Sequence, residues 1–455
     1  MTTLRLGVDV GGTNTDGVIV DAAGAVVASQ KVPTTPDPMD GIRAAMSAVV
    51  EQVDRDAIAQ VMLGTTHPAN AIIQRKGLDR IGLLRTAAPS SYAVRPGAAW
   101  PPELADVILG PTAIVHGGHE YDGREIAALD EEAVRRFAGE CAGQVHAIAV
   151  AAPFSPASYS HEDRAAEIIR EELGDEAAVT VSHEIGSLGL LEREDAAALN
   201  ASLLSVSRAV VDGLAQALSD NGLTVDAYLT QNDGTLMSAE QAMKYPVLTL
   251  ASGPTNSMRG ASALAGLSDA IVIDVGGTST DVGILVDGFP RESMHAVEVG
   301  GVRTNFRMPD LISIGLGGGT IVHGTGGDVR VGPDSVGYRV VDEALVMGGE
   351  VPTLSDVSVR AGRLSGFGDP ALTSKLDPAA ADAALAWVDE QVQILADRMK
   401  ASRQALPLIA VGGGSHLVAE EVPGTSEVIK PPNFAVANAY GAAIAEASGE
   451  VDRVY

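Results

Sequence analysis

The chain has 455 residues, enough for two or three domains around large apolar cores, so a single small module is excluded. Its composition, with 46% hydrophobic and 20% charged residues, is that of a folded protein and excludes a disordered one. The formal net charge of −28 repels nucleic-acid phosphates and anionic membrane surfaces, so we expect neither to be a main partner.

Strand and helix signals alternate along the chain, which predicts an α/β fold with mixed sheets. Short apolar runs predict strands at residues 4–8, 18–20, 25–29, 145–151, 271–273, 284–286 and 408–411. Amphipathic or Ala-rich stretches predict helices at residues 40–53, 160–173, 190–218 and 379–401. Ser160 and Asp163 have the spacing of a capping box for the second of these helices. The Pro-rich segment 92–111 and the Gly-rich segment 315–337 are predicted to be long loops that border a site.

One short motif occurs twice in the chain. DVGGTNTD at residues 9–16 returns as DVGGTSTD at residues 274–281, with seven of eight positions identical. Each copy lies between two predicted strands, so each predicts a strand, a Gly-rich hairpin and a second strand. This duplication predicts two lobes with a cleft between them. We place the division of the chain after residue 186, which gives domains of residues 1–186 and 187–455.

The two hairpins carry residue types that suit a bound polyphosphate. A turn of Gly and Thr residues exposes successive backbone N–H groups and can cradle an anion. Asp9 and Asp274 end their strands at the mouths of these turns, where a carboxylate can hold Mg²⁺ directly or through water. The candidate phosphate-binding residues are Gly11, Gly12, Thr13, Asn14 and Thr15 in the first hairpin and Gly276, Gly277, Thr278, Ser279 and Thr280 in the second.

Two glycine-containing segments near the end of the chain add to this pattern. Gly412, Gly413 and Gly414 follow a predicted strand, so they form either a tight strand-to-helix turn or a place where a nucleotide's sugar or base approaches the backbone. Gly441 lies among alanines in the segment NAYGAAIA, and we expect it to let two helices pack closely.

Cysteine, histidine and the N-terminus bear on metal sites and location. The single Cys141 cannot form an intramolecular disulfide, a cysteine-ligated zinc site or an iron-sulfur cluster, and is expected to be buried. The nine histidines show no metal-ligand spacing, because His116 and His119 lie in a Gly-containing loop. His416 is expected at the surface, at a helix N-terminus. No signal-like segment and no apolar run of ~18 residues is found, which predicts a cytoplasmic protein.

The strand–DxGGT hairpins and the late GGG run resemble those of actin, the heat-shock chaperone ATPases and the sugar kinases. More narrowly, the chain resembles the ATP-dependent hydantoinase and 5-oxoprolinase family. The motifs that carry this narrower resemblance, besides DVGGTNTD, are GTTHPANAIIQRKG at 64–77, LEREDAAALNASL at 191–203, QNDGTLMSAEQA at 231–242, ASGPTNS at 251–257, SIGLGGGT at 313–320, VGPDSVG at 331–337 and PTLSDVSVRAGRL at 352–364. The resemblance implies a duplicated two-lobed actin-like ATPase fold, similar to that of sugar kinases, with a central nucleotide cleft.

The resemblance also implies a function, which is ATP- and Mg²⁺-dependent phosphorylation of the carbonyl oxygen of a cyclic amide. Asp9 and Asp274 would hold Mg²⁺, while Asp16 and Asp281 would orient its waters or the acceptor, or else hydrogen-bond within the turns. The substrate class is a hydantoin, 5-oxoproline or a related lactam. The residues expected to hold this ring, or alternatively to cap a helix, are Thr65, Thr66 and Asn70.

The chain departs from the family pattern in two respects. Thr255, Asn256 and Ser257 stand where a small Ala-Gly-Gly run is expected, and the Gly-rich segment 315–337 lacks the usual Pro-Gly-Pro. The chain is also shorter than the family's subunits. We therefore expect a homo- or hetero-oligomer in which a second hydrolase subunit is a partner. Two other functions are left open: a small-molecule kinase with Asp16, Asp281 or Asp356 as its base, and a non-catalytic switch driven by ATP.

Overall fold

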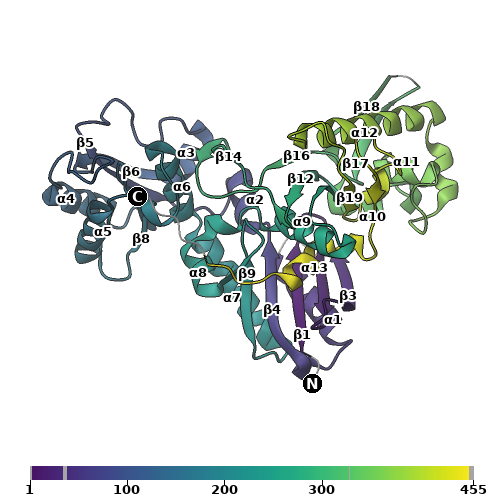
Figure 1. The fold of residues 1–455 in the computed structure, drawn as a ribbon, viewed down its shortest axis with the longest axis horizontal. Coiled ribbons are helices and arrows are strands. Elements are labelled where there is room, and N and C mark those ends of the chain that lie inside the picture. Colours follow the sequence, from purple (N-terminus) through teal and green to yellow (C-terminus); the bar gives the residue numbers. More distant parts are fainter. Residues whose placement is uncertain (1–2, 34–37, 327, 450–455) are drawn as a thin grey trace.

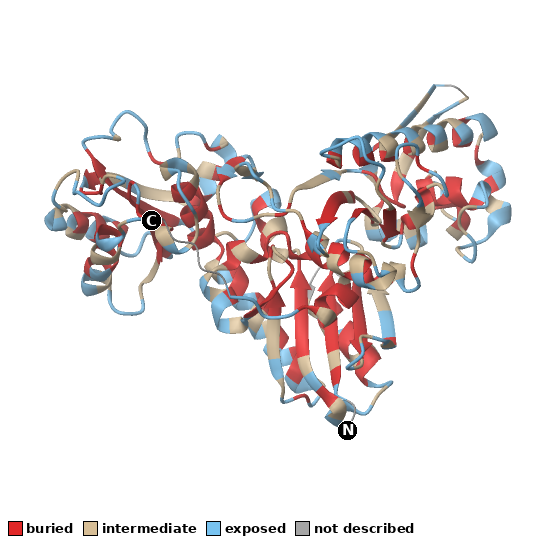
Figure 2. Ribbon diagram, viewed as in Figure 1, coloured by how far each residue is buried: buried red, intermediate tan, exposed pale blue. Residues whose placement is uncertain are grey.

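The computed structural model describes residues 3–33, 38–326 and 328–449. Within these ranges the strands form two six-stranded sheets, a four-stranded sheet and two short hairpins. The three larger sheets belong to three bodies, which spread outward from a common centre (Figure 1). The buried residues concentrate in the strands and in the helix faces that cover them (Figure 2).

The first sheet forms the lower body in Figure 1 and has the strand order β10-β9-β4-β1-β2-β3. Side chains of its central strand alternate between two faces, so Leu6 and Val8 pack toward α1 and α7, whereas Gly7 faces α13. The strands are β1 Leu4–Val10, β2 Asn14–Val20, β3 Val26–Pro33, β4 Ile58–Thr65, β9 Asp226–Thr230 and β10 Leu236–Ser238. The helices of this body are α1 Pro38–Val50, α2 His67–Gln74, α7 Leu204–Asp220 and α8 Ala239–Lys244.

The second sheet repeats the arrangement of the first around the second DVGGT motif. Its order is β13-β12-β11-β19-β20, with β16 also paired to β12. In both sheets the motif begins and ends on paired residues, with Asp9 opposite Asp16 and Asp274 opposite Asp281. The strands are β11 Ala270–Val275, β12 Thr280–Val286, β13 Phe289–Pro290, β16 Leu311–Ile314, β19 Leu408–Val411 and β20 Val428–Ile429. The predicted strand–hairpin–strand units are therefore confirmed.

Helices cover both faces of the second sheet. The core on one side contains apolar side chains of α11 and α12. The helices α9 and α13 lie between the first and second sheets (Figure 1). The helices are α9 Ser252–Ala265, α10 Val340–Glu343, α11 Leu354–Arg360, α12 Pro378–Met399 and α13 Ala437–Ile444, and the short hairpins are β14 Val297–Val299 with β15 Val302–Thr304 and β17 Thr320–Thr325 with β18 Asp328–Ser335.

The third sheet is parallel throughout, with the order β6-β5-β7-β8, and forms the left-hand body in Figure 1. Its strands alternate, so Leu84 and Val150 pack against α4 and α5, while Leu83 and Ala149 pack against α6. The strands are β5 Ile81–Ala88, β6 Leu109–His116, β7 Ala147–Ala151 and β8 Ala178–Val181. The helices are α3 Pro102–Ile108, α4 Glu131–Cys141, α5 Ser160–Leu173 and α6 Leu190–Ser202.

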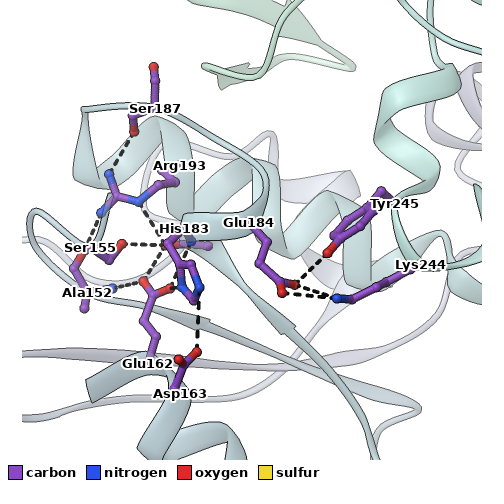
Figure 3. Close-up of polar contacts among 11 residues, drawn as sticks. Ala152, Ser155, Glu162, Asp163, His183, Glu184, Ser187, Arg193, Lys244 and Tyr245 are labelled. Atoms are coloured by element: carbon purple, nitrogen blue, oxygen red, sulfur yellow. Dashed lines mark hydrogen bonds and ion pairs between the residues drawn. The ribbon is translucent and has the colours of Figure 1, made fainter. Parts of the chain in front are cut away.

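A buried polar network joins the third sheet to α6 (Figure 3). The carboxylate of Glu162 accepts hydrogen bonds from the Ala152 backbone N–H at 2.7 Å, from the Ser182 hydroxyl at 2.5 Å and from ring Nδ1 of His183 at 2.7 Å. Arg193 Nε donates to the same Ser182 hydroxyl at 2.9 Å. This network links segments on both sides of residue 186, and β9 and β10 of the first sheet also follow that position. The first sheet and this network therefore each contain residues from both sides of residue 186, and the division into 1–186 and 187–455 stays a prediction.

Three local predictions are corrected by tertiary contacts. The segment 92–111 is not a simple loop, because it contains α3 and the start of β6, and the segment 315–337 contains the β17–β18 hairpin. The helix predicted over 190–218 is two helices, α6 and α7. Asp79 fills the break between them, because its N–H donates to Ser202 O at 2.8 Å and its carboxylate accepts from Ser205 N at 2.9 Å.

The helix predicted over 160–173 is confirmed as α5, but the prediction of a capping box at its start is wrong. Tyr159 is the N-cap residue and makes no side-chain cap. Ser160 is the first helical residue, and its hydroxyl lies 3.4 Å from His119 Nε2 instead of capping the helix. No helix among the described residues has the length and apolarity needed to cross a membrane.

Gly441 lets α9 and α13 cross in backbone contact, as the sequence predicts. A Cβ atom at Gly441 would lie 1.9 Å from the carbonyl oxygen of Asn256, and one at Gly260 would lie 1.9 Å from that of Ala437. Because both obstructing atoms belong to the backbone, neither clash can be relieved by a rotamer change.

We therefore expect Gly441→Ala to lower the free energy of unfolding by about 1–3 kcal/mol, as overpacking does in other cores. Thermal and urea unfolding followed by circular dichroism measures this. Gly139→Ala is the matched control, since Gly139 is an exposed helical glycine with no atom within 4 Å of the added Cβ. That control should leave stability unchanged or raise it slightly. Equal stability of the two variants would contradict the prediction.

Candidate functional site

The two DVGGT hairpins face each other across one pocket. A Cβ at Gly277 would lie 2.4 Å from Thr13 Oγ1, and one at Gly12 would lie 3.8 Å from Thr278 Oγ1, so the hairpin tips meet. The predicted residues that line the pocket are Asp9, Gly11, Gly12, Thr13, Asn14, Asp16, Thr66, Asp274, Gly276, Gly277, Thr278, Ser279, Asp281, Gly412 and Gly413. The fold thus brings together most residues of the predicted site from segments hundreds of positions apart.

The hairpins have the same internal geometry. Gly11 N donates to Asn14 O at 3.0 Å, and Gly276 N donates to Ser279 O at 2.9 Å. Each turn is closed by this hydrogen bond and is made of small residues, so a ligand can approach the backbone of its tip. Side chains larger than glycine at Gly277 or Gly412 would fill the space, since a Cβ at Gly412 would lie 2.2 Å from Asp274 Oδ1.

Asp9 is buried at the base of the pocket and is held by two amides. Asn256 Nδ2 donates to one carboxylate oxygen at 3.2 Å, and Asn438 Nδ2 donates to the other at 2.9 Å. Burial, together with the nearby charges of Asp16 and Asp274, raises the pKa of Asp9 to about 7 against the opposing effect of the two amide donors. Asp9 would therefore be stabilised as a carboxylate by any cation that enters the pocket.

Asp16 is also buried, whereas Asp274 and Asp281 are half-buried, and desolvation raises the pKa of all three; for Asp281 it reaches about 6. The protein donors to these acids are Lys31 at 2.5 Å and Asn438 for Asp16, Ser257 at 2.5 Å for Asp274, and Ser313 for Asp281. Four carboxylates with so few donors form a site that suits a hard divalent cation such as Mg²⁺, whose preferred ligands are oxygens.

Several residues of this site escaped the sequence analysis. They are Lys31, Asn256, Ser257 and Asn438. Two signals could have pointed to them. Asn256 and Ser257 stand in the segment that departs from the small-residue pattern, and Lys31 follows the Asp21–Gly24 turn on the strand that should pair with Asp16. Asn438 was assigned only to helix packing, and nothing local distinguished it.

Three residues predicted to bind the nucleotide do not line the pocket. The Thr15 side chain points toward α1, where a Cβ at Gly41 would lie 2.5 Å from Thr15 Oγ1. Thr280 Oγ1 donates to Leu316 O at 2.6 Å. The reason is alternation, because both threonines are the strand residues next to a pocket-facing acid and so point to the opposite face. Gly414 lies behind its turn, with its N–H donated to Val275 O at 2.7 Å.

The predicted substrate residues lie beside the first hairpin at the start of α2. Thr66 lines the pocket, its hydroxyl donates to Val10 O at 3.0 Å, and it accepts from Asn70 Nδ2 at 3.2 Å. Thr65 Oγ1 accepts from the N–H of His67, the first residue of α2, at 3.1 Å, whereas Thr66 is the N-cap residue and makes no side-chain cap. Asn70 is not among the pocket-lining residues and reaches the pocket only through Thr66.

Histidines gather elsewhere, at the carboxyl ends of the third sheet's strands. Ligand-type atoms of His119, Glu125 and His161 lie within 4.8 Å of one another, a grouping that the sequence spacing did not predict. The Gly118 N–H donates to His161 Nδ1 at 2.8 Å, so the ring proton is on Nε2, 3.5 Å from the Glu125 carboxylate. His161 is thus a donor to Glu125 and lacks the lone pair that a metal would need.

His416 is not the surface residue that the sequence predicts. Its ring is largely buried behind the Gly412–Gly414 turn, and burial lowers the pKa of His416 to about 4. It is therefore neutral at physiological pH and adds no charge to the pocket.

The chain matches the family model for the hydantoinase/oxoprolinase N-terminal region over residues 5–173 and the model for hydantoinase/oxoprolinase over residues 193–386. It is 29% identical to the caprolactamase subunit alpha of Pseudomonas jessenii over 79% of this chain and 55% of that protein. It is also 29% identical to the acetophenone carboxylase gamma subunit of Aromatoleum aromaticum, over 79% of this chain and 53% of that protein. The chain thus spans about half the length of the curated relatives it matches.

A solved structure of ATP-dependent caprolactamase from Pseudomonas jessenii has the same fold, with a TM-score of 0.77 at 24% identity over 96% of this chain and 70% of that one. Together with the two matching six-stranded sheets, this likeness confirms the predicted duplicated α/β fold. Two adjoining models of one family cover most of the sequence. The chain therefore belongs to the hydantoinase/oxoprolinase family.

Proposed function

We propose that this chain binds Mg²⁺ and ATP between its two hairpins and phosphorylates the carbonyl oxygen of a cyclic amide to promote ring opening. The observation that carries the proposal is the pair of matching Gly-Thr hairpins, each with two acids, that face one pocket in a chain of this family. The substrate class is a hydantoin, 5-oxoproline or a related lactam.

The pocket fits this pair of ligands. The Gly- and Thr-rich hairpin tips that line the pocket suit phosphate oxygens, and its four acids suit Mg²⁺. In the proposal, Asp9 and Asp274 hold the ion directly or through water, while Asp16 and Asp281 orient its waters or the acceptor. Gly412 and Gly413 offer bare backbone beside Asp274, where the nucleoside would approach.

A lactam hydrolyses slowly because amide resonance stabilises its carbonyl group. When bound, ATP would supply the phosphoryl group that moves to the carbonyl oxygen with release of ADP. Water would then add to the carbon, and the ring C–N bond would break as the nitrogen takes a proton and leaves as an amine. A second water would hydrolyse the resulting acyl phosphate to a carboxylate and phosphate. The residues of this chain position and neutralise charge, because little covalent chemistry is left for the protein. Thr66, at the pocket wall beside the first hairpin, would orient the ring, with Asn70 supporting its hydroxyl.

Partners and location are part of the same proposal. The relatives are named as subunits, one alpha and one gamma, and this chain spans about half the length of each. We therefore propose a homo- or hetero-oligomer with a second hydrolase subunit that completes ring opening. Cytoplasmic location, and two domains divided after residue 186, are further parts of the proposal.

The test is amide-dependent formation of ADP by the purified chain, with hydantoin, 5-oxoproline and simple lactams supplied in turn. We expect at least one cyclic amide to raise the ATPase rate. Thr66→Val keeps the shape and removes the hydroxyl, so it should lower this stimulation about fivefold, equal to about 1 kcal/mol. ATP affinity should change less, and the exposed Thr224→Val should behave as the parent chain.

Other outcomes would replace the proposal. Stimulation by a sugar or an alcohol, with no response to amides, would favour a small-molecule kinase. A slow ATPase that responds to neither, but changes shape on binding ATP, would favour a conformational switch. Stimulation by a ketone with bicarbonate would favour a carboxylase, the activity named for the acetophenone carboxylase relative.

A further inference from the structure

The pocket is strongly acidic, and Lys31 brings the one positively charged side chain among the described residues that line it. Four carboxylates share the pocket with this single ammonium group. The carboxylates repel a triphosphate that enters the pocket, unless positively charged groups lie next to its phosphates. The position of Lys31 therefore determines where in the pocket an anion is attracted.

Lys31 lies at one end of a row of paired residues that crosses the first sheet. Strand pairing sets Asp9 opposite Asp16 and Asp16 opposite Lys31, so these side chains follow one another along the pocket floor. The Lys31 ammonium is 2.5 Å from Asp16 Oδ1. The Asp16 side chain is 3% exposed and fixed, whereas that of Lys31 is 32% exposed and has a flexible four-carbon stem.

The duplicated halves of the site differ at this position. In the second sheet, Ser313 of β16 pairs with Asp281 as Lys31 of β3 pairs with Asp16. Both hairpins bring two acids to the pocket, so Lys31 makes the two halves differ in charge. Gly412 and Gly413 lie beside Asp274 in the other half. The phosphate chain therefore has a preferred direction, with its most charged end toward the first sheet.

We infer that Lys31 binds the terminal phosphate of the nucleotide, sharing its ammonium between Asp16 and that phosphate, and so makes the site prefer a nucleoside triphosphate to a diphosphate. This inference rests on the proposed function. In the absence of nucleotide, Asp16 keeps the Lys31 ammonium at the pocket wall. The Lys31 side chain therefore loses little conformational entropy when the nucleotide binds.

Calorimetric titration with Mg²⁺ and either ADP or a non-hydrolysable ATP analogue tests the inference without relying on turnover. Lys31→Met keeps the length of the side chain and removes its charge. We expect it to weaken binding of the ATP analogue about tenfold or more, as loss of a charged hydrogen bond does, and binding of ADP by less than about twofold. Lys31→Arg should keep the preference, and Lys76→Met, at an exposed lysine outside the pocket, is the control.

A second variant separates lost attraction from new repulsion. Lys31→Met leaves the Asp16 carboxylate without its positively charged partner, and that carboxylate would itself repel the analogue. In the double variant Lys31→Met/Asp16→Asn both charges are gone, and we expect the preference for the ATP analogue still to be lost. Recovery of the parent's preference in the double variant, or an unchanged preference in Lys31→Met, would overturn the inference and leave the proposed function standing. Failure of the parent chain to bind either nucleotide would overturn both.

Discussion

Asp9→Asn and Asp274→Asn are each expected to lower ATP turnover by about a hundredfold or more while the fold survives. The change is nearly isosteric and removes a negative charge that would otherwise hold Mg²⁺ at the base of the pocket. Burial already raises the pKa of both acids, so loss of the negative charge should not by itself reduce stability. Steady-state ADP release and calorimetric binding of Mg²⁺ with ATP measure the effect.

Asp382→Asn is the control for this pair, because Asp382 is exposed on α12, away from the pocket. It should turn over ATP at the parent's rate. Circular dichroism on all three variants checks that the fold is kept. Undiminished binding and turnover in both Asp9→Asn and Asp274→Asn would rule out the assigned role of these acids.

Arg85→Met is expected to cause the largest loss of stability. Arg85 is fully buried in β5, and two of its nitrogens each lie 2.6 Å from a Glu194 carboxylate oxygen. A third nitrogen donates to Val94 O at 2.7 Å. Removing the arginine leaves the Glu194 charge buried without its partner, a change that costs about 3–5 kcal/mol. Urea unfolding measures the loss, and hydrogen exchange should localise it to the third sheet.

Two comparisons make this prediction specific. The double variant Arg85→Met/Glu194→Leu removes both charges and should recover much of the lost stability, since a buried pair can often be replaced by apolar residues. Arg135→Met breaks a surface pair with Glu172 at 2.9 Å and should cost at most about 1 kcal/mol. A loss in Arg85→Met as small as that in Arg135→Met would contradict the buried-pair argument.

Much of the fold and half of the site can be predicted from local sequence patterns. The strands at Leu4 and Ala270 and the Gly-rich turns after them depend on alternation and on glycine, which act over a few residues. The repeat of the motif then predicts two equivalent sheets. The close approach at Gly441 also follows from its small neighbours, because only residues without bulk allow two backbones to meet.

Contacts between distant segments could not be predicted in this way. Asp9 is held by Asn256 and Asn438, which are more than two hundred residues away in the chain, and no local pattern encodes such a pairing. Lys31 reaches Asp16 only because the register of β2 and β3 sets them opposite each other. Register and helix crossing depend on the packing of the whole molecule, since a shift of one residue turns every side chain to the other face. The acids and glycines of the pocket can therefore be recognised in the sequence, whereas the residues that hold and balance them are determined by tertiary packing.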